Sequence, residues 1–357
     1  MIKSKVFLPE LDGLRFIAFL LIFIHHSSTQ GVAIFREIKT IGWLGVEIFF
    51  CLSAFLLTRL LLRERDQFGT VDVYKFFMRR ILRIWPLYFT YVILAIILSV
   101  YWHVITSGNL HRIVGLLTFT DNFFAAFQGF NPIRFTGHLW TISYEEQFYL
   151  CLPFFVPYLF QQTPAKRMMF LVTLLIVSQV AKCISVYDRL DDPFIWTVPI
   201  THPESIIAGI MMAFYEKTCA SLNRMLVGAT IVVSACLIFF MPDTTITSYA
   251  LVLTYPLAGL FSASVVCFSI NDGTPAFKNF LSNNIIRFLG KISFGLYVFH
   301  SFCMNAVNEV MGFSHPLLNF FISLAAVVFV SAVSYYLLEK RFLLIKKERF
   351  TRIPVSG

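Results

Sequence analysis

Residues 14–26 read LRFIAFLLIFIHH, an apolar run with an arginine near one end and two histidines at the other. A run of this composition is typical of a helix that crosses a membrane. Arg15 and His26 lie eleven residues apart, so 3.6 residues per turn return them to nearly the same face, about 16 Å apart along the axis. His25 points roughly 100° away. Because charged groups at such depth are costly and usually functional, we expect Arg15 and His26 to share one site.

The whole chain has the composition of a membrane protein. Of its 357 residues, 57% are hydrophobic and 14% are charged, whereas about 25% would be charged in a soluble domain. Apolar stretches long enough to cross hydrocarbon recur at about 14–29, 42–61, 86–103, 138–160, 168–185, 203–215, 225–241, 249–269, 292–309 and 317–337. We predict an all-α polytopic integral membrane protein, with about ten transmembrane helices around a central polar site. Residues 1–357 form one domain with no separate soluble part, and 113–127 is an interfacial or re-entrant piece.

The distribution of lysine and arginine predicts the orientation. With a cytoplasmic N-terminus, nearly every inner loop carries more basic residues than the outer loops, which favours ten crossings with both termini in the cytoplasm. The net charge of +9 is then a topology signal, and we expect no nucleic-acid partner. The seven cysteines are scattered without a CxxC pair, so we expect no metal site and no disulfide framework.

A second polar group opens the fourth span, at His138-Leu-Trp140-Thr-Ile-Ser143-Tyr-Glu145-Glu146. Two adjacent carboxylates inside an apolar helix cannot both face lipid. They form either an interhelical ion pair or part of a reactive site, and we expect at least one to be reactive. His138 and Glu145 share a face of the helix with Tyr149, and Ser143 lies on a neighbouring stripe.

A third polar group lies in the ninth span, where Ser293, Tyr297 and His300 recur on one face. Counting residues from the predicted ends of the helices places His26, Glu146 and His300 at similar depth, near the middle of the bilayer. We therefore expect three helices to contribute to one buried site, although His300 also fits a satisfied core histidine.

A fourth polar group lies on the predicted cytoplasmic side, where Arg79, Arg80 and Arg83 precede the third span. It is either positive-inside charge or an anion site for a phosphorylated cosubstrate, since arginine grips phosphate with a planar fork. Spacing does not choose between the two. Arg15 likewise has two interpretations: its side chain extends to the lipid headgroups, or it belongs to the site. Asp12, three residues earlier, is placed to form an ion pair with it.

These motifs together resemble the acyltransferase-3 family of integral membrane acyltransferases. The segments that carry the resemblance follow one another in order and cover nearly the whole chain: LDGLRFIAFLLIFIHH, GVEIFFCLSAFLLTR, FMRRILRIWPLY, HLWTISYEEQFYLCLP, FLGKISFGLYVFH and SYYLLEKRF with Glu339. The chain departs from the family pattern at Ala54, where glycine is usual. It also departs at His202 and Pro203, where many members have an arginine followed by an acidic residue.

The resemblance implies transfer of an acyl group, commonly acetyl from acetyl-CoA, to a hydroxyl of a glycan or other acceptor. Some members carry an additional extracytoplasmic esterase-like domain; this chain ends soon after Glu339, so we expect it to lack that domain. We expect acyl-CoA as a cosubstrate and no permanently bound cofactor. The expected surroundings are the bacterial plasma (inner) membrane, with a homodimer as a possible assembly.

The expected site residues fall into three groups. The catalytic group holds His26, as general base or transient acyl carrier, together with Arg15 and with Glu145 or Glu146 to orient the imidazole. The cofactor-binding group would bind the phosphates of coenzyme A, through Arg79, Arg80 and Arg83, and would line the path of its pantetheine arm, through Arg15. The substrate-binding group polarises the thioester carbonyl or binds the acceptor: Trp140, Ser143, Tyr297 and His300.

A transporter or flippase is the main alternative, because a proton-coupled carrier would show the same buried arginine, histidine and glutamate. The absence of a visible internal repeat and the full series of motifs argue against it. A glycan polymerase is a third interpretation, but its polar groups would gather in a large outer loop, and the stretch from Trp102 to Gly137 has few charges.

Overall fold

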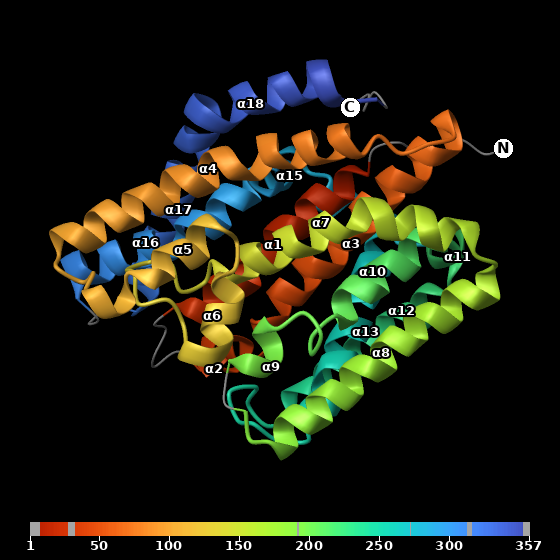
Figure 1. The fold of residues 1–357 in the computed structure, drawn as a ribbon, viewed down its shortest axis with the longest axis horizontal. Helices are drawn as coiled ribbons and strands as arrows, with labels where there is room; N and C mark the ends of the chain where they lie inside the picture. The colour runs from red at the N-terminus through yellow and green to blue at the C-terminus, as the bar shows by residue number, and fades with distance from the viewer. Residues whose placement is uncertain (1–7, 28–32, 191–192, 272, 313–315, 353–357) are drawn as a thin grey trace.

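The computed structural model describes residues 8–27, 33–190, 193–271, 273–312 and 316–352. Every regular element within these ranges is a helix, so the predicted all-α fold is confirmed for this part of the chain. Figure 1 shows the helices packed into one bundle.

Each of the ten apolar stretches predicted from the sequence falls on a helix. The helices are α1 (Pro9–His26), α3 (Leu44–Phe68), α4 (Val73–Tyr101), α7 (Trp140–Gln161), α8 (Pro164–Tyr187), α10 (Glu204–Phe214), α12 (Arg224–Phe239), α13 (Leu251–Ile270), α16 (Ser293–Met311) and α17 (Pro316–Ser334). After α17 the helix continues through η2 (Tyr335–Glu339), α18 (Lys340–Ile345) and η3 (Lys346–Phe350).

Among the described residues, 5 helices are long and apolar enough to cross a membrane: α3, α4, α8, α13 and the continuous run Pro316–Phe350. α10 and α12 are apolar but shorter. These helices fit the predicted integral membrane protein, and a set of ten crossings stays a prediction.

Shorter helices fill the connections. They are α2 (Ala33–Ile41), η1 (Ser107–Asn109), α5 (His111–Leu117), α6 (Asp121–Gln128), α9 (Phe194–Thr197), α11 (Glu216–Ser221), α14 (Pro275–Leu281) and α15 (Asn284–Lys291). The marginal stretch 113–127 falls on α5 and α6. A buried ion pair joins these two helices, with 3.3 Å between Arg112 Nη2 and Asp121 Oδ1. In Figure 1, α2, α6 and α9 gather at one end of the bundle.

Local signals explain where several long helices begin and end. Asp72 caps α4, because its carboxylate accepts the Lys75 amide at 2.9 Å. Thr163 caps α8 in the same way, and Pro164 takes the first helical position, where no amide donor is needed. α3 ends at Gly69, whose φ of +74° is the left-handed conformation of a helix C-terminus.

Helix α1 runs through the middle of the bundle and contacts α3, α13, α15 and α16 (Figure 1). Glycine sets the closest approaches between helices. A Cβ on Gly45 of α3 would lie 2.3 Å from the Ala18 carbonyl oxygen of α1, and one on Gly209 of α10 would lie 2.2 Å from that of Cys51 in α3. Small residues let helix backbones approach in this way in membrane proteins. The close packing of α3 against both α1 and α10 therefore depends on two glycines, Gly45 and Gly209.

Gly209→Ala tests this packing. The added methyl group has no room against the Cys51 carbonyl, so we expect a loss of about 1–3 kcal/mol in stability and a lower thermal unfolding midpoint in detergent. Gly228→Ala in α12 is the matched control, because its Cβ would meet only Phe268 at 3.7 Å, an ordinary contact. Equal midpoints for the two variants would contradict the role of Gly209.

Candidate active site

Two neighbouring cavities hold most of the polar residues singled out in the sequence. The first, here called the arginine cavity, has a volume of about 90 Å³ and is lined by Arg15, Arg80, Arg83, Glu145, Tyr149 and Ser53 with apolar neighbours. The second, here called the histidine cavity, has a volume of about 960 Å³. Its lining includes His25, His26, His138, His202 and His300 with three tryptophans.

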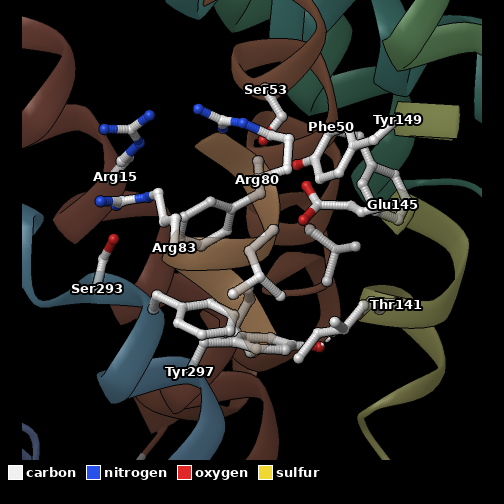
Figure 2. Close-up of a pocket in the computed structure, with 16 residues that line it drawn as sticks. Arg15, Phe50, Ser53, Arg80, Arg83, Thr141, Glu145, Tyr149, Ser293 and Tyr297 are labelled. Atoms are coloured by element: carbon white, nitrogen blue, oxygen red, sulfur yellow. Dashed lines mark hydrogen bonds between the residues drawn. The ribbon is translucent and has the colours of Figure 1, made fainter. Parts of the chain in front are cut away.

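The two cavities share four lining residues: Ile22, Val46, Thr141 and Tyr297. We call this shared set the neck. The Thr141 and Tyr297 hydroxyls lie 2.6 Å apart, and the Tyr297 hydroxyl donates to the His138 carbonyl at 2.9 Å. Figure 2 shows these two side chains at the lower end of the arginine cavity, away from the arginines. The neck therefore lies between a small cationic cavity and a large cavity lined with imidazoles.

Helix α1 contributes to both cavities. Arg15 lines the arginine cavity and His26 the histidine cavity, so the two residues lie on opposite sides of the neck. The predicted ion pair of Arg15 with Asp12 is confirmed, with 3.0 Å between Nη1 and Oδ1. Arg15 and His26 thus line two adjacent cavities and do not share one site as predicted.

Cationic groups dominate the arginine cavity. Arg80 and Arg83 reach it from α4 and Arg15 from α1, and Glu145 of α7 is the one carboxylate among the described residues that line it. In Figure 2 the Arg15 and Arg83 side chains lie on one side and Glu145 with Tyr149 on the other. Three guanidinium groups against one carboxylate leave a net positive charge, which suits an anionic ligand.

Arg79 lies apart from this cavity, although it is next to Arg80 in the chain. Its Nη2 donates to Glu64 Oε2 at 3.0 Å, and its Nη1 donates to the Phe350 carbonyl at 3.0 Å. Arg352 also contacts Glu64, at 3.1 Å. Arg79 is thus engaged in a buried ion pair that ties α3, α4 and the C-terminal η3 together, and the structure does not bring it to the predicted phosphate site.

The side chains of the two adjacent glutamates of α7 have different surroundings. Glu145 lines the arginine cavity within hydrogen-bonding reach of the Ser53 and Tyr149 hydroxyls. Glu146 points elsewhere, and its Oε2 accepts from Trp85 Nε1 at 3.2 Å. Of the two, Glu145 is therefore placed in a cavity. It lies in the arginine cavity and not in the cavity that His26 lines, so the structure does not place it as the carboxylate that orients His26.

A backbone carbonyl orients His26 instead. His26 Nδ1 lies 3.1 Å from the Ile22 carbonyl oxygen, one turn earlier in α1. A carbonyl only accepts, so Nδ1 carries the proton, and the neutral ring presents the lone pair of Nε2. The side chain is exposed to the histidine cavity. The lone pair of the neutral ring is thus on Nε2, on the side chain that lines the histidine cavity.

Two further imidazoles surround it. The ring centroid of His300 lies 5.0 Å from that of His26 and 4.5 Å from that of His138. His300 Nδ1 lies 2.5 Å from the Tyr297 carbonyl, and His138 Nε2 lies 3.2 Å from the Val298 carbonyl. The predicted convergence of the first and ninth spans at His26 and His300 is present in the geometry. Within the described part of the chain, no group of three or more His, Cys, Asp or Glu residues is arranged to hold a metal ion.

The other predicted substrate-binding residues divide between cavity and core. Trp140 lines the histidine cavity, where its ring packs edge-on against Trp196 at 5.0 Å. Tyr297 belongs to the neck, and its hydroxyl proton is already donated to a carbonyl. Ser143 is fully buried and lines neither cavity. Trp140 and Tyr297 therefore line the histidine cavity, whereas Ser143 does not.

One pair in the wall of the histidine cavity was not predicted from the sequence. Glu47 of α3 lies 2.7 Å from His202 Nε2, and its other oxygen accepts from Ser205 at 2.5 Å. His202 Nδ1 contacts the Trp196 carbonyl at 2.9 Å. The signal for Glu47 was present, because a lone carboxylate interrupts the apolar run GVEIFF. The signal for its partner was not, since His202 lies 155 positions further along the chain.

Comparison with known proteins indicates the family of the chain. Residues 8–336 match the acyltransferase-3 family, described as an acyltransferase domain. The chain is 25% identical over 366 residues to a Staphylococcus aureus (strain COL) protein whose name marks it as a candidate O-acetyltransferase, covering 95% of this chain and 58% of that protein. It is 24% identical over 360 residues to peptidoglycan O-acetyltransferase OatA of Listeria monocytogenes, covering 94% and 56%.

A third relative is O-acetyltransferase OatA of Staphylococcus aureus (strain NCTC 8325), 25% identical over 364 residues, covering 94% of this chain and 57% of the relative. The chain therefore spans less than three fifths of the length of these curated relatives. No solved structure matches it. With the family match extending over nearly all of the described helices, the chain belongs to the acyltransferase-3 family of membrane acyltransferases.

Proposed function

We propose that this protein is a membrane-bound O-acetyltransferase that moves an acetyl group from cytoplasmic acetyl-CoA to a hydroxyl of a glycan or another exported acceptor. The observation that carries the proposal is the neck. It lies between a cationic cavity and a larger cavity that His26 lines, with the lone pair of its neutral ring on Nε2. A donor and an acceptor entering from opposite sides would meet at that nitrogen.

The arginine cavity would receive the donor. Arg15, Arg80 and Arg83 supply planar guanidinium groups that suit the phosphates of coenzyme A. The cavity volume of about 90 Å³ leaves room for a thin chain and not for a nucleotide. We therefore assign the phosphates to the end of the cavity where the three arginines lie, and the pantetheine arm to the cavity itself, with Glu145 beside the arm.

The histidine cavity would receive the acceptor. Its volume of about 960 Å³ is that of a site for a molecule larger than acetate, and Trp43, Trp140 and Trp196 supply flat aromatic faces in its lining. Aromatic faces with a few polar groups are the usual lining of an organic-ligand site. One relative is named for peptidoglycan, so a cell-wall saccharide is the first acceptor to try.

His26 would carry out the transfer. Its Nε2 lone pair removes the proton of the acceptor hydroxyl as the oxygen forms a bond to the acyl carbon, or attacks the thioester first to form a transient acyl-imidazole. In either case the carbon–sulfur bond breaks and coenzyme A leaves as a thiolate. No carboxylate is needed to fix the tautomer, because the Ile22 carbonyl does so.

The membrane arrangement follows from the same assignment. We propose ten crossings, formed by the ten apolar helices, with both termini in the cytoplasm of a bacterial cell. Arg80 and Arg83 lie in the basic stretch that the charge bias assigns to the cytoplasmic side. The arginine cavity would then open toward the compartment that holds acetyl-CoA.

His26→Ala tests the reaction. We expect the purified variant to lose transfer from labelled acetyl-CoA, and release of free coenzyme A, by about 100-fold or more, because general base or nucleophilic catalysis contributes at least that much. His111→Ala, at an exposed position, is the control and should keep wild-type rates. Wild-type activity in His26→Ala would remove the proposal, and a wild-type protein that neither binds acetyl-CoA nor releases coenzyme A would favour a transporter.

Arg83→Gln and Arg79→Gln form a matched pair that tests the donor site. Arg83 faces the cavity, so we expect its variant to bind acetyl-CoA roughly tenfold more weakly or worse, with little change in thermal stability. Arg79 is buried against Glu64, so its variant leaves a buried charge short of a partner and should lose stability by roughly 3–5 kcal/mol. Affinity by calorimetry and the unfolding midpoint separate the two, and reversed effects would contradict the assignment.

A further inference from the structure

His300 holds a buried nitrogen that has no partner within the protein. Its side chain is 0% exposed, yet it contributes to the lining of the histidine cavity. Nδ1 lies 2.5 Å from the Tyr297 carbonyl, whereas Nε2 has no hydrogen-bond partner among the described residues. An unpaired buried polar atom costs free energy. A ligand that bonds Nε2 would remove that cost.

The carbonyl contact decides which kind of bond Nε2 can make. Because the Tyr297 carbonyl accepts, Nδ1 carries the proton of the neutral ring and Nε2 carries the lone pair. Nε2 can therefore accept a hydrogen bond or a proton, and it has no hydrogen to donate. His300 cannot polarise a thioester carbonyl in this state, so of the two predicted roles only contact with the acceptor hydroxyl remains.

A second base next to His26 matters for one of the two routes open to the reaction. If the acyl group is carried on His26 Nε2, then that nitrogen is blocked while the hydroxyl attacks. The Nδ1 of His26 is turned toward the Ile22 carbonyl and cannot take the proton. Two imidazole rings lie beside that of His26, with centroids 5.2 Å away for His25 and 5.0 Å away for His300. Both have Nδ1 on a backbone carbonyl and so keep a lone pair on Nε2. We choose His300 because its Nε2 is buried and has no hydrogen-bond partner among the described residues.

We propose that the reaction takes the acyl-imidazole route and that His300 is a second catalytic base, which takes the proton of the acceptor hydroxyl while His26 carries the acyl group. This inference rests on the proposed function. In the first step, His26 Nε2 bonds the acyl carbon, the carbon–sulfur bond breaks and the electron pair leaves on the thiolate of coenzyme A. The products are an acyl-imidazolium and a thiolate, so charge is conserved.

In the second step the acceptor oxygen bonds the acyl carbon, and its proton moves to His300 Nε2. The carbon–nitrogen bond breaks, and its electron pair returns to His26 Nε2. His300 is then an imidazolium and His26 is neutral. Transfer of this proton to the thiolate, or its exchange through water, restores both rings and yields the free thiol.

His138 lies beside His300. Its Nε2 is bonded to the Val298 carbonyl, so its lone pair is on Nδ1, which has no partner among the described residues. Its ring lies 4.5 Å from that of His300 between centroids.

Three measurements on purified protein separate the two steps. Exchange of labelled coenzyme A into acetyl-CoA reports the first step alone. Formation of acetylhydroxamate from hydroxylamine reports capture of the acyl group by a nucleophile that needs no base. Hydrolysis of acetyl-CoA reports attack by water, a hydroxyl compound that needs a base and is always present.

For His300→Asn, we expect exchange and hydroxamate formation close to wild-type rates and hydrolysis lower by about 100-fold. Added imidazole should restore hydrolysis to His300→Ala, because the histidine cavity has room for it. His111→Asn is the matched control at an exposed imidazole. The unfolding midpoint of each variant shows whether the chain remains folded.

The opposite results overturn the inference. Unchanged hydrolysis in His300→Asn means that His300 is not the base. Loss of all three activities in a folded variant means that it serves the first step. If the wild-type protein shows neither exchange nor hydroxamate, then no acyl-imidazole forms, and this result needs no variant. An acetyl-CoA-dependent transfer that persists without exchange would leave the proposed function intact, whereas absence of acetyl-CoA binding would remove both.

Discussion

The structure depends on one constraint: every polar group in an apolar bundle needs a partner, and the choice of partner decides what the group can still do. The imidazoles show this most clearly. His26 and His300 each give the Nδ1 proton to a carbonyl of their own helix, so each keeps a lone pair on Nε2. Backbone carbonyls within a helix are rigid, and they fix the tautomer without adding a charge to a medium that penalises charge.

The same constraint separates residues that look alike in the sequence. Arg79 and Arg80 are neighbours, but one turns to Glu64 and the other to the arginine cavity. Consecutive residues on a helix point roughly 100° apart, so adjacent arginines of one motif meet different surroundings. The basic stretch was predicted as either charge for topology or an anion site; Arg79 instead forms a buried ion pair, and the anion site stays a prediction.

Helix positions were readily predicted from the sequence, because apolar length and composition determine them: each of the ten apolar stretches falls on a helix. The contact of Arg15 with Asp12 was equally accessible, being one turn of the same helix. Partners that tertiary packing brings together could not be predicted from the sequence. Nothing local to Glu146 indicates Trp85, and nothing local to Glu47 indicates His202. Depth counting brought His26 and His300 together but could not foresee that Glu145 opens to the other cavity.

The hydroxyls of Thr141 and Tyr297, 2.6 Å apart, also bear on the permeability of the bilayer. A slender chain can pass between the two spaces only by displacing side chains, and an adenine nucleotide is far too wide to follow. If the proposed transfer takes place, this contact would let a small acyl group cross while the bilayer stays closed to larger solutes.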